Sequence, residues 1–187
     1  EMGGLNPVIV LPDANFEEAA KAVVTGAFTG EGQRCTATKR LILVDGVPDD
    51  FLDLVARKAA AYKIGPGFNP ETQIGPLVSP EALQGVLDII EASVRAGMKR
   101  VYGGERLTEG DFEHGNFMQP GIFEGDPDNT GHRLLHEEAF GPVLSVARAR
   151  DLDHAFAIAN GAEADHRHAA SIFTSGLNSA FRFLAEV

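Results

Sequence analysis

Short runs of consecutive apolar residues set the strongest limit on how this chain can fold. Residues 7–11 read Pro-Val-Ile-Val-Leu, and residues 40–45 read Arg-Leu-Ile-Leu-Val-Asp. Runs of this length without alternating polar residues are typical of strands that are buried on both faces. Segments with helical spacing separate such runs along the chain. The sequence therefore predicts an α/β fold with a largely parallel, twisted sheet flanked by helices.

The same pattern assigns the remaining elements. We expect further strands over residues 100–104, 117–123, 143–147 and 168–174, and helices over residues 15–28, 48–62, 79–96 and 151–160, with another from residue 177. Pro120 has no N–H for a strand ladder, so the strand around it is expected at a sheet edge. Residues 124–135 are expected to form a loop. The irregular stretch 63–77 is expected to be functional, because loops of this length are uncommon in compact domains.

Composition limits the possible partners and the compartment. The 187 residues carry 16 basic and 27 acidic side chains, for a net charge of −11. This charge argues against nucleic acid and anionic membranes as partners. A single cysteine excludes an internal disulfide and fits a reducing compartment, so we expect a cytoplasmic protein. The chain begins at Glu1 and ends inside an expected helix, so we expect a fragment of a longer protein.

The only cysteine, Cys35, lies in the stretch Gly-Glu-Gly-Gln-Arg-Cys-Thr, residues 30–36. The two glycines allow a sharp turn, and Arg34 places a positive charge beside a sulfur that must ionise to react. The alternative is that Cys35 is a small buried core residue. A nucleophile needs access, so we expect Cys35 in a pocket open to solvent, on a turn that leads into a helix or at the start of that helix.

Several motifs along the chain occur together in one known family. Residues 1–4 read Glu-Met-Gly-Gly, and residues 32–35 read Gly-Gln-Arg-Cys. In this order and at this spacing, the two elements resemble the signature pair of the aldehyde dehydrogenase superfamily. Residues 137–143, Glu-Glu-Ala-Phe-Gly-Pro-Val, resemble a third element of that family, and residues 169–174 resemble a later strand. The run Gly-Gln-Arg-Cys-Thr-Ala-Thr is similar to that of semialdehyde dehydrogenases.

The resemblance implies a site and a cofactor. It makes Cys35 the nucleophile that forms a thiohemiacetal with an aldehyde, with its own backbone N–H as one donor to the oxyanion. It makes Glu1 the base that activates water to hydrolyse the later thioester. Glu138 would hold the nicotinamide ribose and Phe140 would lie against the nicotinamide side of the pocket, with NAD or NADP accepting the hydride.

The resemblance also implies a substrate and a domain organisation. Arg34 and Thr36 flank the nucleophile and would shape the substrate pocket, for which we expect a small aldehyde, in particular an anionic semialdehyde. The family's nucleotide-binding domain lies mostly before the Glu-Met-Gly-Gly element. We therefore expect residues 1–187 to form the catalytic domain without it, and to be inactive alone. The family forms dimers through a strand that lies beyond Val187, and we expect the full-length protein to be a homo-oligomer.

Three alternatives stay open at this point. A CoA-acylating relative would resolve the thioester with CoA and would not need Glu1. A non-catalytic, structural relative would need none of the site residues. A thiol hydrolase would need a histidine partner for Cys35, and neither core motif contains one.

The sequence also holds two histidine pairs that deserve a test as metal ligands. His132 and His136 are four residues apart, which suits a metal site on a helix. His166 and His168 are two residues apart. The first pair precedes a strand-like segment and has no third ligand nearby, and the second pair lies where a strand is expected to begin, so we expect no metal site at either pair.

Overall fold

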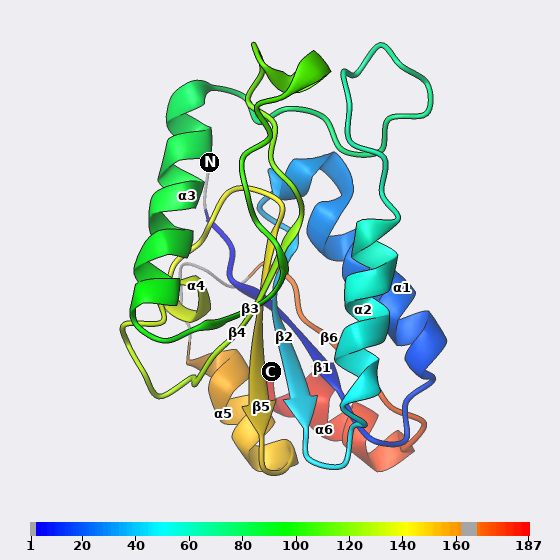
Figure 1. The fold of residues 1–187 in the computed structure, drawn as a ribbon. Coiled ribbons are helices and arrows are strands. Elements are labelled where there is room, and N and C mark those ends of the chain that lie inside the picture. The colour runs from blue at the N-terminus through cyan, green and yellow to red at the C-terminus, as the bar shows by residue number, and fades with distance from the viewer. Residues whose placement is uncertain (1–2, 162–167) are drawn as a thin grey trace.

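The structure is a computed structural model that describes residues 3–161 and 168–187. Its centre is a six-stranded sheet in the order β3-β4-β5-β2-β1-β6 (Figure 1). Neighbouring strands are parallel except for β3, which is antiparallel to β4. The largely parallel sheet is therefore confirmed. The strands are β1 (Asn6–Val10), β2 (Thr38–Val44), β3 (Lys99–Gly103), β4 (Gly121–Glu124), β5 (Val143–Ala149) and β6 (Ser171–Phe173).

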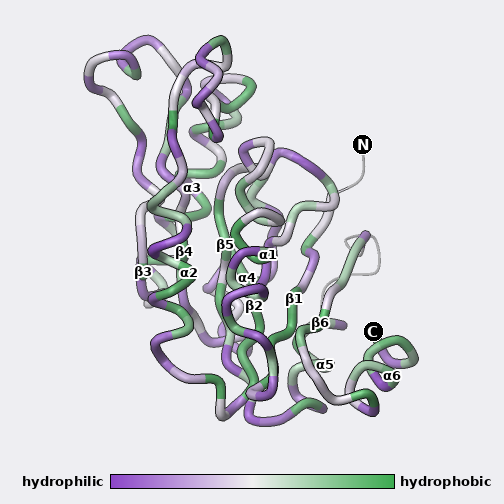
Figure 2. The backbone as a smooth tube through the Cα atoms, turned by 90° about the vertical axis from the view of Figure 1, so that its right-hand side faces the viewer, coloured by the Kyte–Doolittle hydropathy of each residue, from purple (hydrophilic) through white to green (hydrophobic). Residues whose placement is uncertain are grey.

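Strands β1 and β2 occupy the middle of the sheet, as their apolar runs predict. Every residue of both strands is buried. Each strand is covered by other elements on both faces, so there is no solvent side that would select alternating polar residues. Figure 2 shows this pattern as hydrophobic residues along β1 and hydrophilic ones in many of the connecting loops.

Helices cover the two faces of the sheet in separate groups (Figure 1). Helices α1 (Phe16–Phe28) and α2 (Asp50–Ala60) share one hydrophobic cluster with β1, β2 and β5. On the opposite face, α5 (Leu152–Asn160) and α6 (Leu177–Glu186) pack against β1 and β2. Helices α3 (Pro80–Arg95) and α4 (Arg133–His136) pack against the β4 and β5 half of the sheet.

Local signals explain where several helices begin and end. The Asn15 side chain accepts a hydrogen bond from the backbone N–H of Glu18, which satisfies a free donor at the start of α1. Ser79 does the same for α3 through the N–H of Ala82. Gly97, with a φ of 108°, ends the chain's helical course just after α3. The helices expected at 15–28 and 79–96 are therefore confirmed.

Two expectations from the sequence are wrong. The strand expected at an edge around Pro120 is β4, which begins one residue later and pairs with β3 on one side and β5 on the other. Pro120 precedes the ladder, and the first ladder N–H comes from Gly121, which donates to the carbonyl of Pro142 at 2.8 Å. A proline at this point costs no strand hydrogen bond. The expected loop 124–135 also contains most of α4.

Among residues 3–161 and 168–187, no helix combines the length and the apolar character that crossing a membrane would require.

Candidate active site

Cys35 lies on a turn that reverses the chain between α1 and β2. Gly30 and Gly32 both have positive φ angles, of 65° and 64°, which end the helical path after α1. A further turn follows, in which Ala37 donates its backbone N–H to the carbonyl of Arg34 at 3.0 Å. Cys35 is a free, half-buried cysteine in this second turn. The turn leads into strand β2 and not into a helix, so that part of the expectation is wrong.

The turn is tied to the irregular loop at residues 63–78 by two side chains. Glu31 has a φ of 57°, which is unusual for a residue other than glycine, and its Oε1 accepts the backbone N–H of Gly75 at 2.7 Å. The Oε1 of Gln33 accepts the backbone N–H of Val78 at 2.9 Å. The strained conformation of Glu31 thus has a partner that holds it, and the long loop supports the Cys35 turn from outside.

Asn6 supports the same turn from inside the sheet. Its side-chain Nδ2 donates to the carbonyl of Cys35 at 2.7 Å and to the carbonyl of Ala37 at 2.8 Å. Its Oδ1 accepts the backbone N–H groups of His168 and Ala169, at 3.2 and 2.9 Å. Both donors and the acceptor of the amide are therefore used. One buried side chain links the Cys35 turn, the start of β1 and the approach to β6.

The second glycine of the first motif, Gly4, lies directly against Cys35. A Cβ atom added to Gly4 would fall 2.1 Å from the Cys35 carbonyl oxygen, closer than any real contact. Only glycine fits there, because the two backbones touch. Glu1 lies outside the described residues, so its role stays a prediction.

A buried lysine joins the Cys35 turn to the third motif. The Nζ atom of Lys39 donates to the carbonyls of Gly32, Ala139 and Gly141 at 2.6, 2.8 and 3.0 Å. Lys39 is only 3% exposed. Ala139 and Gly141 lie about 100 residues along the chain from Lys39. Segment 138–141 is therefore held against the turn by the three hydrogen bonds of a single ammonium group.

Gly32 and Gly141 form the closest contact between the two segments. A Cβ atom on Gly32 would lie 2.2 Å from the carbonyl oxygen of Gly141 and 2.8 Å from that of Ala27. The positive φ of Gly32 would also disfavour any side chain. The two glycines thus let a pair of motifs meet backbone to backbone.

Glu138 and Phe140 sit in the segment that Lys39 holds. The Oε1 atom of Glu138 is buried and has no hydrogen-bond partner among the described residues. Phe140 is half-buried, and its ring centroid lies 5.9 Å from the Lys39 Nζ. A buried carboxylate oxygen without a donor is costly, and such groups call for an explanation.

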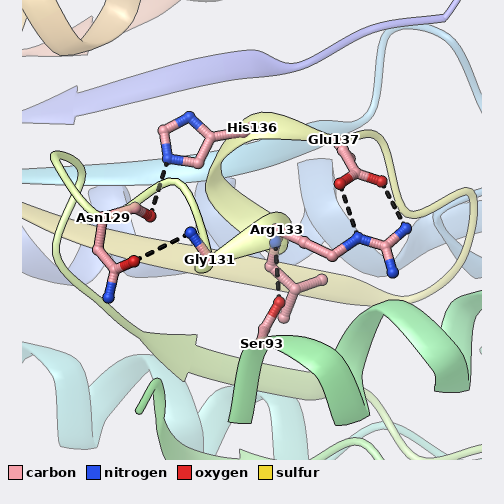
Figure 3. A network of polar contacts seen from close by, with 7 residues as sticks. Ser93, Asn129, Gly131, Arg133, His136 and Glu137 are labelled. Carbon is pink, nitrogen blue, oxygen red and sulfur yellow. Dashed lines mark hydrogen bonds and ion pairs between the residues drawn. The ribbon is translucent and has the colours of Figure 1, made fainter. Parts of the chain in front are cut away.

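The segment just before Glu138 is fixed by polar contacts around α4 (Figure 3). Arg133 donates from Nε and Nη2 to the two carboxylate oxygens of Glu137, both at 2.6 Å. These hydrogen bonds hold the pKa of Glu137 below its usual value, although burial opposes them. The backbone N–H of Leu134 donates to the buried Oγ of Ser93 at 3.0 Å. Glu137 is therefore paired at the surface, whereas the buried oxygen of its neighbour Glu138 has no partner in the part of the chain that the structure describes.

The first histidine pair is engaged by backbone groups. The backbone N–H of Asp126 donates to the His132 Nδ1 at 2.9 Å. The His136 ring nitrogen lies 3.2 Å from the carbonyl of Asn129, as Figure 3 shows. Within the described part of the chain, no three residues of types that bind metals lie together. In the second pair, His166 lies outside that part.

The two residues flanking Cys35 differ in their surroundings. Arg34 donates from Nε to the carbonyl of Thr29 and from Nη2 to that of Gly26, both at 3.1 Å. Its cation therefore caps the carbonyl end of α1, where positive charge is favourable. Thr36 is exposed. The predicted contribution of Arg34 and Thr36 to a substrate pocket stays a prediction.

Two supporting residues were not assigned a role from the sequence. Lys39 and Asn6 make the contacts that bring the motifs together, yet each acts on backbone atoms that are distant in sequence. One signal was present for Lys39. Lysine is almost never fully buried unless it is paired, and Lys39 stands at the start of a strand that is buried on both faces. Burial lowers the pKa of Lys39 from 10.5 to about 8, while the charge of Glu138 opposes that shift and the charge of Arg34 adds to it.

The site also has a common position relative to the sheet. Gly4 precedes β1, Cys35 precedes β2 and Gly141 precedes β5, and these three strands are parallel neighbours. All three motifs therefore meet at the amino-terminal ends of these strands.

Comparison with known proteins adds a family to this geometry. The sequence profile described as "Aldehyde dehydrogenase family" matches residues 1–187. The chain is 36% identical over 187 residues to the alpha-ketoglutaric semialdehyde dehydrogenase of Bacillus subtilis (strain 168). That alignment covers all of this chain and 38% of the relative, so the chain spans well under half the length of this curated relative.

Solved structures agree with the sequence comparison. The betaine aldehyde dehydrogenase of Staphylococcus aureus, in complex with NAD+, matches with a TM-score of 0.92 and 28% identity over all of this chain and 36% of that one. The 1-pyrroline-5-carboxylate dehydrogenase from Thermus with bound NAD matches with a TM-score of 0.89 and 34% identity, over 98% of this chain and 34% of that one.

We expect Gly32→Ala to destabilise the fold strongly. The substitution combines a positive φ with a clash against Gly141, so we expect the free energy of unfolding to fall by about 2–4 kcal/mol. Gly67→Ala is the matched control, because no atom lies within 4 Å of its added Cβ and its φ is not in the left-handed range. Its effect should stay within about 0.5 kcal/mol. Urea unfolding followed by circular dichroism measures both, and equal midpoints would contradict the contact.

The buried lysine also predicts a dependence of stability on pH. Between about pH 8 and 10.5 the unfolded chain keeps the Lys39 proton that the folded chain has lost, so stability rises with pH in that window. The cost of burying the charge is fully present below about pH 8. Relative to Lys39→Met, the wild type should gain up to roughly 3 kcal/mol across the window. Urea unfolding of both proteins from pH 7 to 10 measures the difference, and a constant difference would refute this assignment.

Proposed function

Because this chain belongs to the aldehyde dehydrogenase family, we propose that residues 1–187 form the catalytic domain of an enzyme that oxidises an aldehyde to a carboxylic acid with NAD or NADP. The observation that carries the proposal is the meeting of three motif segments at one turn. Gly4 contacts the carbonyl of Cys35, and Lys39 holds Gly32 beside Gly141. Segments that lie far apart in sequence thus surround a single free cysteine.

Cys35 is the proposed nucleophile. Its thiolate would attack the aldehyde carbon, and the electron pair of the carbonyl would move to oxygen to give a thiohemiacetal. The backbone N–H of Cys35 makes no hydrogen bond within the described residues, so it is available as a donor to that oxyanion. Asn6 fixes the carbonyls of Cys35 and Ala37, which keeps the turn from rotating this N–H away.

Glu1 is the proposed base for the second half of the reaction. Oxidation leaves a thioester on Cys35, and a carboxylate that removes a proton from water would allow its hydrolysis to the acid. The support for Glu1 is its place in the Glu-Met-Gly-Gly motif, whose last residue, Gly4, contacts Cys35.

The residues of segment 138–141 fit a nicotinamide cofactor. The buried Glu138 Oε1 has no donor among the described residues, and a ribose hydroxyl is a donor of the kind it needs. Phe140 offers a half-buried ring in the same segment. When bound, NAD or NADP supplies the hydride acceptor for the oxidation. Glu138 and Phe140 would bind and orient that group, and Lys39 would hold the segment that carries them.

We further propose a semialdehyde as the substrate, with Arg34 and Thr36 at the pocket. The support is the similarity to the alpha-ketoglutaric semialdehyde dehydrogenase of Bacillus subtilis and the exposed cation beside the nucleophile. Because Arg34 is already hydrogen-bonded to the carbonyls of Thr29 and Gly26, it would act on an anionic substrate mainly through its charge.

The remaining proposals concern the complete protein. We place the nucleotide-binding domain outside residues 1–187, and we expect a cytoplasmic homo-oligomer. Residues 1–187 alone should then react with a thiol reagent but form no NADH, because holding a cofactor against the adduct supplies on the order of 7–11 kcal/mol in favourable cases.

Cys35→Ala tests the nucleophile in the complete protein. We expect aldehyde-dependent NADH formation to fall by on the order of 10⁴-fold or more, because Cys35 is the only thiol in residues 1–187. Absorbance at the NADH band with a panel of aldehydes and either cofactor measures the loss. Product analysis separates a free acid from an acyl-CoA. Turnover that survives Cys35→Ala would refute the mechanism.

Glu138→Gln tests the cofactor role, and Glu137→Gln is its matched control. Loss of a charge-assisted hydrogen bond should raise the KM for NAD or NADP about 10- to 100-fold. Glu137 is paired with Arg133 at the surface, so its substitution should change KM less than about twofold. The rate of Cys35 alkylation by iodoacetamide should stay the same in both variants. Equal KM values for the two variants would remove Glu138 from the cofactor site.

A further inference from the structure

We propose that Lys39 is a positioning residue that fixes the Cys35 turn and segment 138–141 relative to each other. The inference rests on the proposed function, because it concerns the distance between the proposed nucleophile and the proposed cofactor segment. Lys39 lies on β2, four residues after Cys35, and its side chain reaches across to the segment that precedes β5.

Lys39 uses all of its hydrogen-bond donors on backbone carbonyls of the two segments. An ammonium group has three N–H donors and no acceptor, and here each donor has a carbonyl partner. One carbonyl belongs to Gly32 in the turn, and two belong to Ala139 and Gly141. A shift of either segment relative to the other must therefore lengthen at least one of these hydrogen bonds.

The carbonyl oxygens also need a hydrogen-bond donor between them. The oxygens of Gly32, Ala139 and Gly141 all lie within 3.0 Å of one nitrogen, so their negative ends converge on one point. Buried carbonyl oxygens that converge in this way are unfavourable without N–H donors between them. Removing the ammonium group would leave oxygens that repel each other, and the two segments would move apart.

The surrounding side chains place Lys39 beside the proposed cofactor residues. The charge of Glu138 acts on Lys39 from the same segment, and Arg34 acts on it from the turn. The Phe140 ring centroid lies 5.9 Å from the ammonium nitrogen. Lys39 thus contacts the backbone on both sides of Phe140 without itself being exposed to a ligand.

Lys39→Met tests the proposal, with Lys99→Met as the matched control. Methionine keeps much of the length of the side chain but has no donors, and Lys99 is an exposed lysine on β3. Amide hydrogen exchange followed by mass spectrometry is measured on the complete protein without substrate. We expect exchange in residues 30–36 and 137–143 to accelerate at least about tenfold in Lys39→Met, with α2 and α3 unchanged. Lys99→Met should change neither segment.

The affinity for NAD provides the second measurement. Titration of the same proteins should show a dissociation constant about tenfold higher in Lys39→Met and an unchanged one in Lys99→Met. Exchange that accelerates evenly over the chain, or in neither segment, would overturn the proposal. Local acceleration with unchanged NAD affinity would overturn the link to the cofactor.

A second variant covers the case in which Lys39→Met does not fold. Lys39→Arg keeps the charge, but its planar guanidinium cannot direct donors to the same three points. We expect a smaller acceleration confined to the same two segments, and no change at all would overturn the proposal. If the wild type binds no NAD and forms no NADH, the proposed function fails, whereas the exchange result still decides whether Lys39 joins the two segments.

Discussion

The structure depends on two buried cations at the start of β2 that gather backbone carbonyls from distant segments. Lys39 donates to three carbonyls on the face covered by α1 and α2. Arg40, which points to the other face, donates to the carbonyls of Leu5, Ile158 and Ala159 at 2.8–2.9 Å. Buried carbonyls need a hydrogen-bond donor, and where helices and strands do not provide one, these two side chains do. The strand after Cys35 therefore binds the turn, the chain before β1 and the end of α5 into one unit.

The sequence predicted those elements whose signals are local. The apolar runs of β1 and β2 and the caps Asn15 and Ser79 each lie within a few residues of the structure they specify. The position of β4 could not be found in this way, because its neighbours β3 and β5 are chosen by packing and not by Pro120. Strand order is a property of the whole core.

The candidate site shows the same division between local and distant information. Motif order identified Cys35 and Glu138 as candidates, and the structure adds what surrounds each of them. Lys39 had a weak signal, since a charge in a buried strand is unusual, but its partners lie about 100 residues away. No spacing rule connects them, because the contact is created by the parallel pairing of β2 with β5. The supporting residues of a site are harder to read from sequence than its reactive ones for this reason.

The motifs lie where β1, β2 and β5 begin, so within the described residues the carboxyl ends of these strands lie away from Cys35. Open α/β sheets commonly place ligands at the carboxyl ends of their strands, and here those ends continue into turns such as the one at Asp45 and Gly46, whose residues are exposed. That turn is separated from Cys35 by the seven residues of β2, which is about 23 Å of strand. Exposed turns of this kind accept insertions and new chain ends. A fluorophore, an affinity tag or a permuted terminus placed there would therefore lie away from the Cys35 turn.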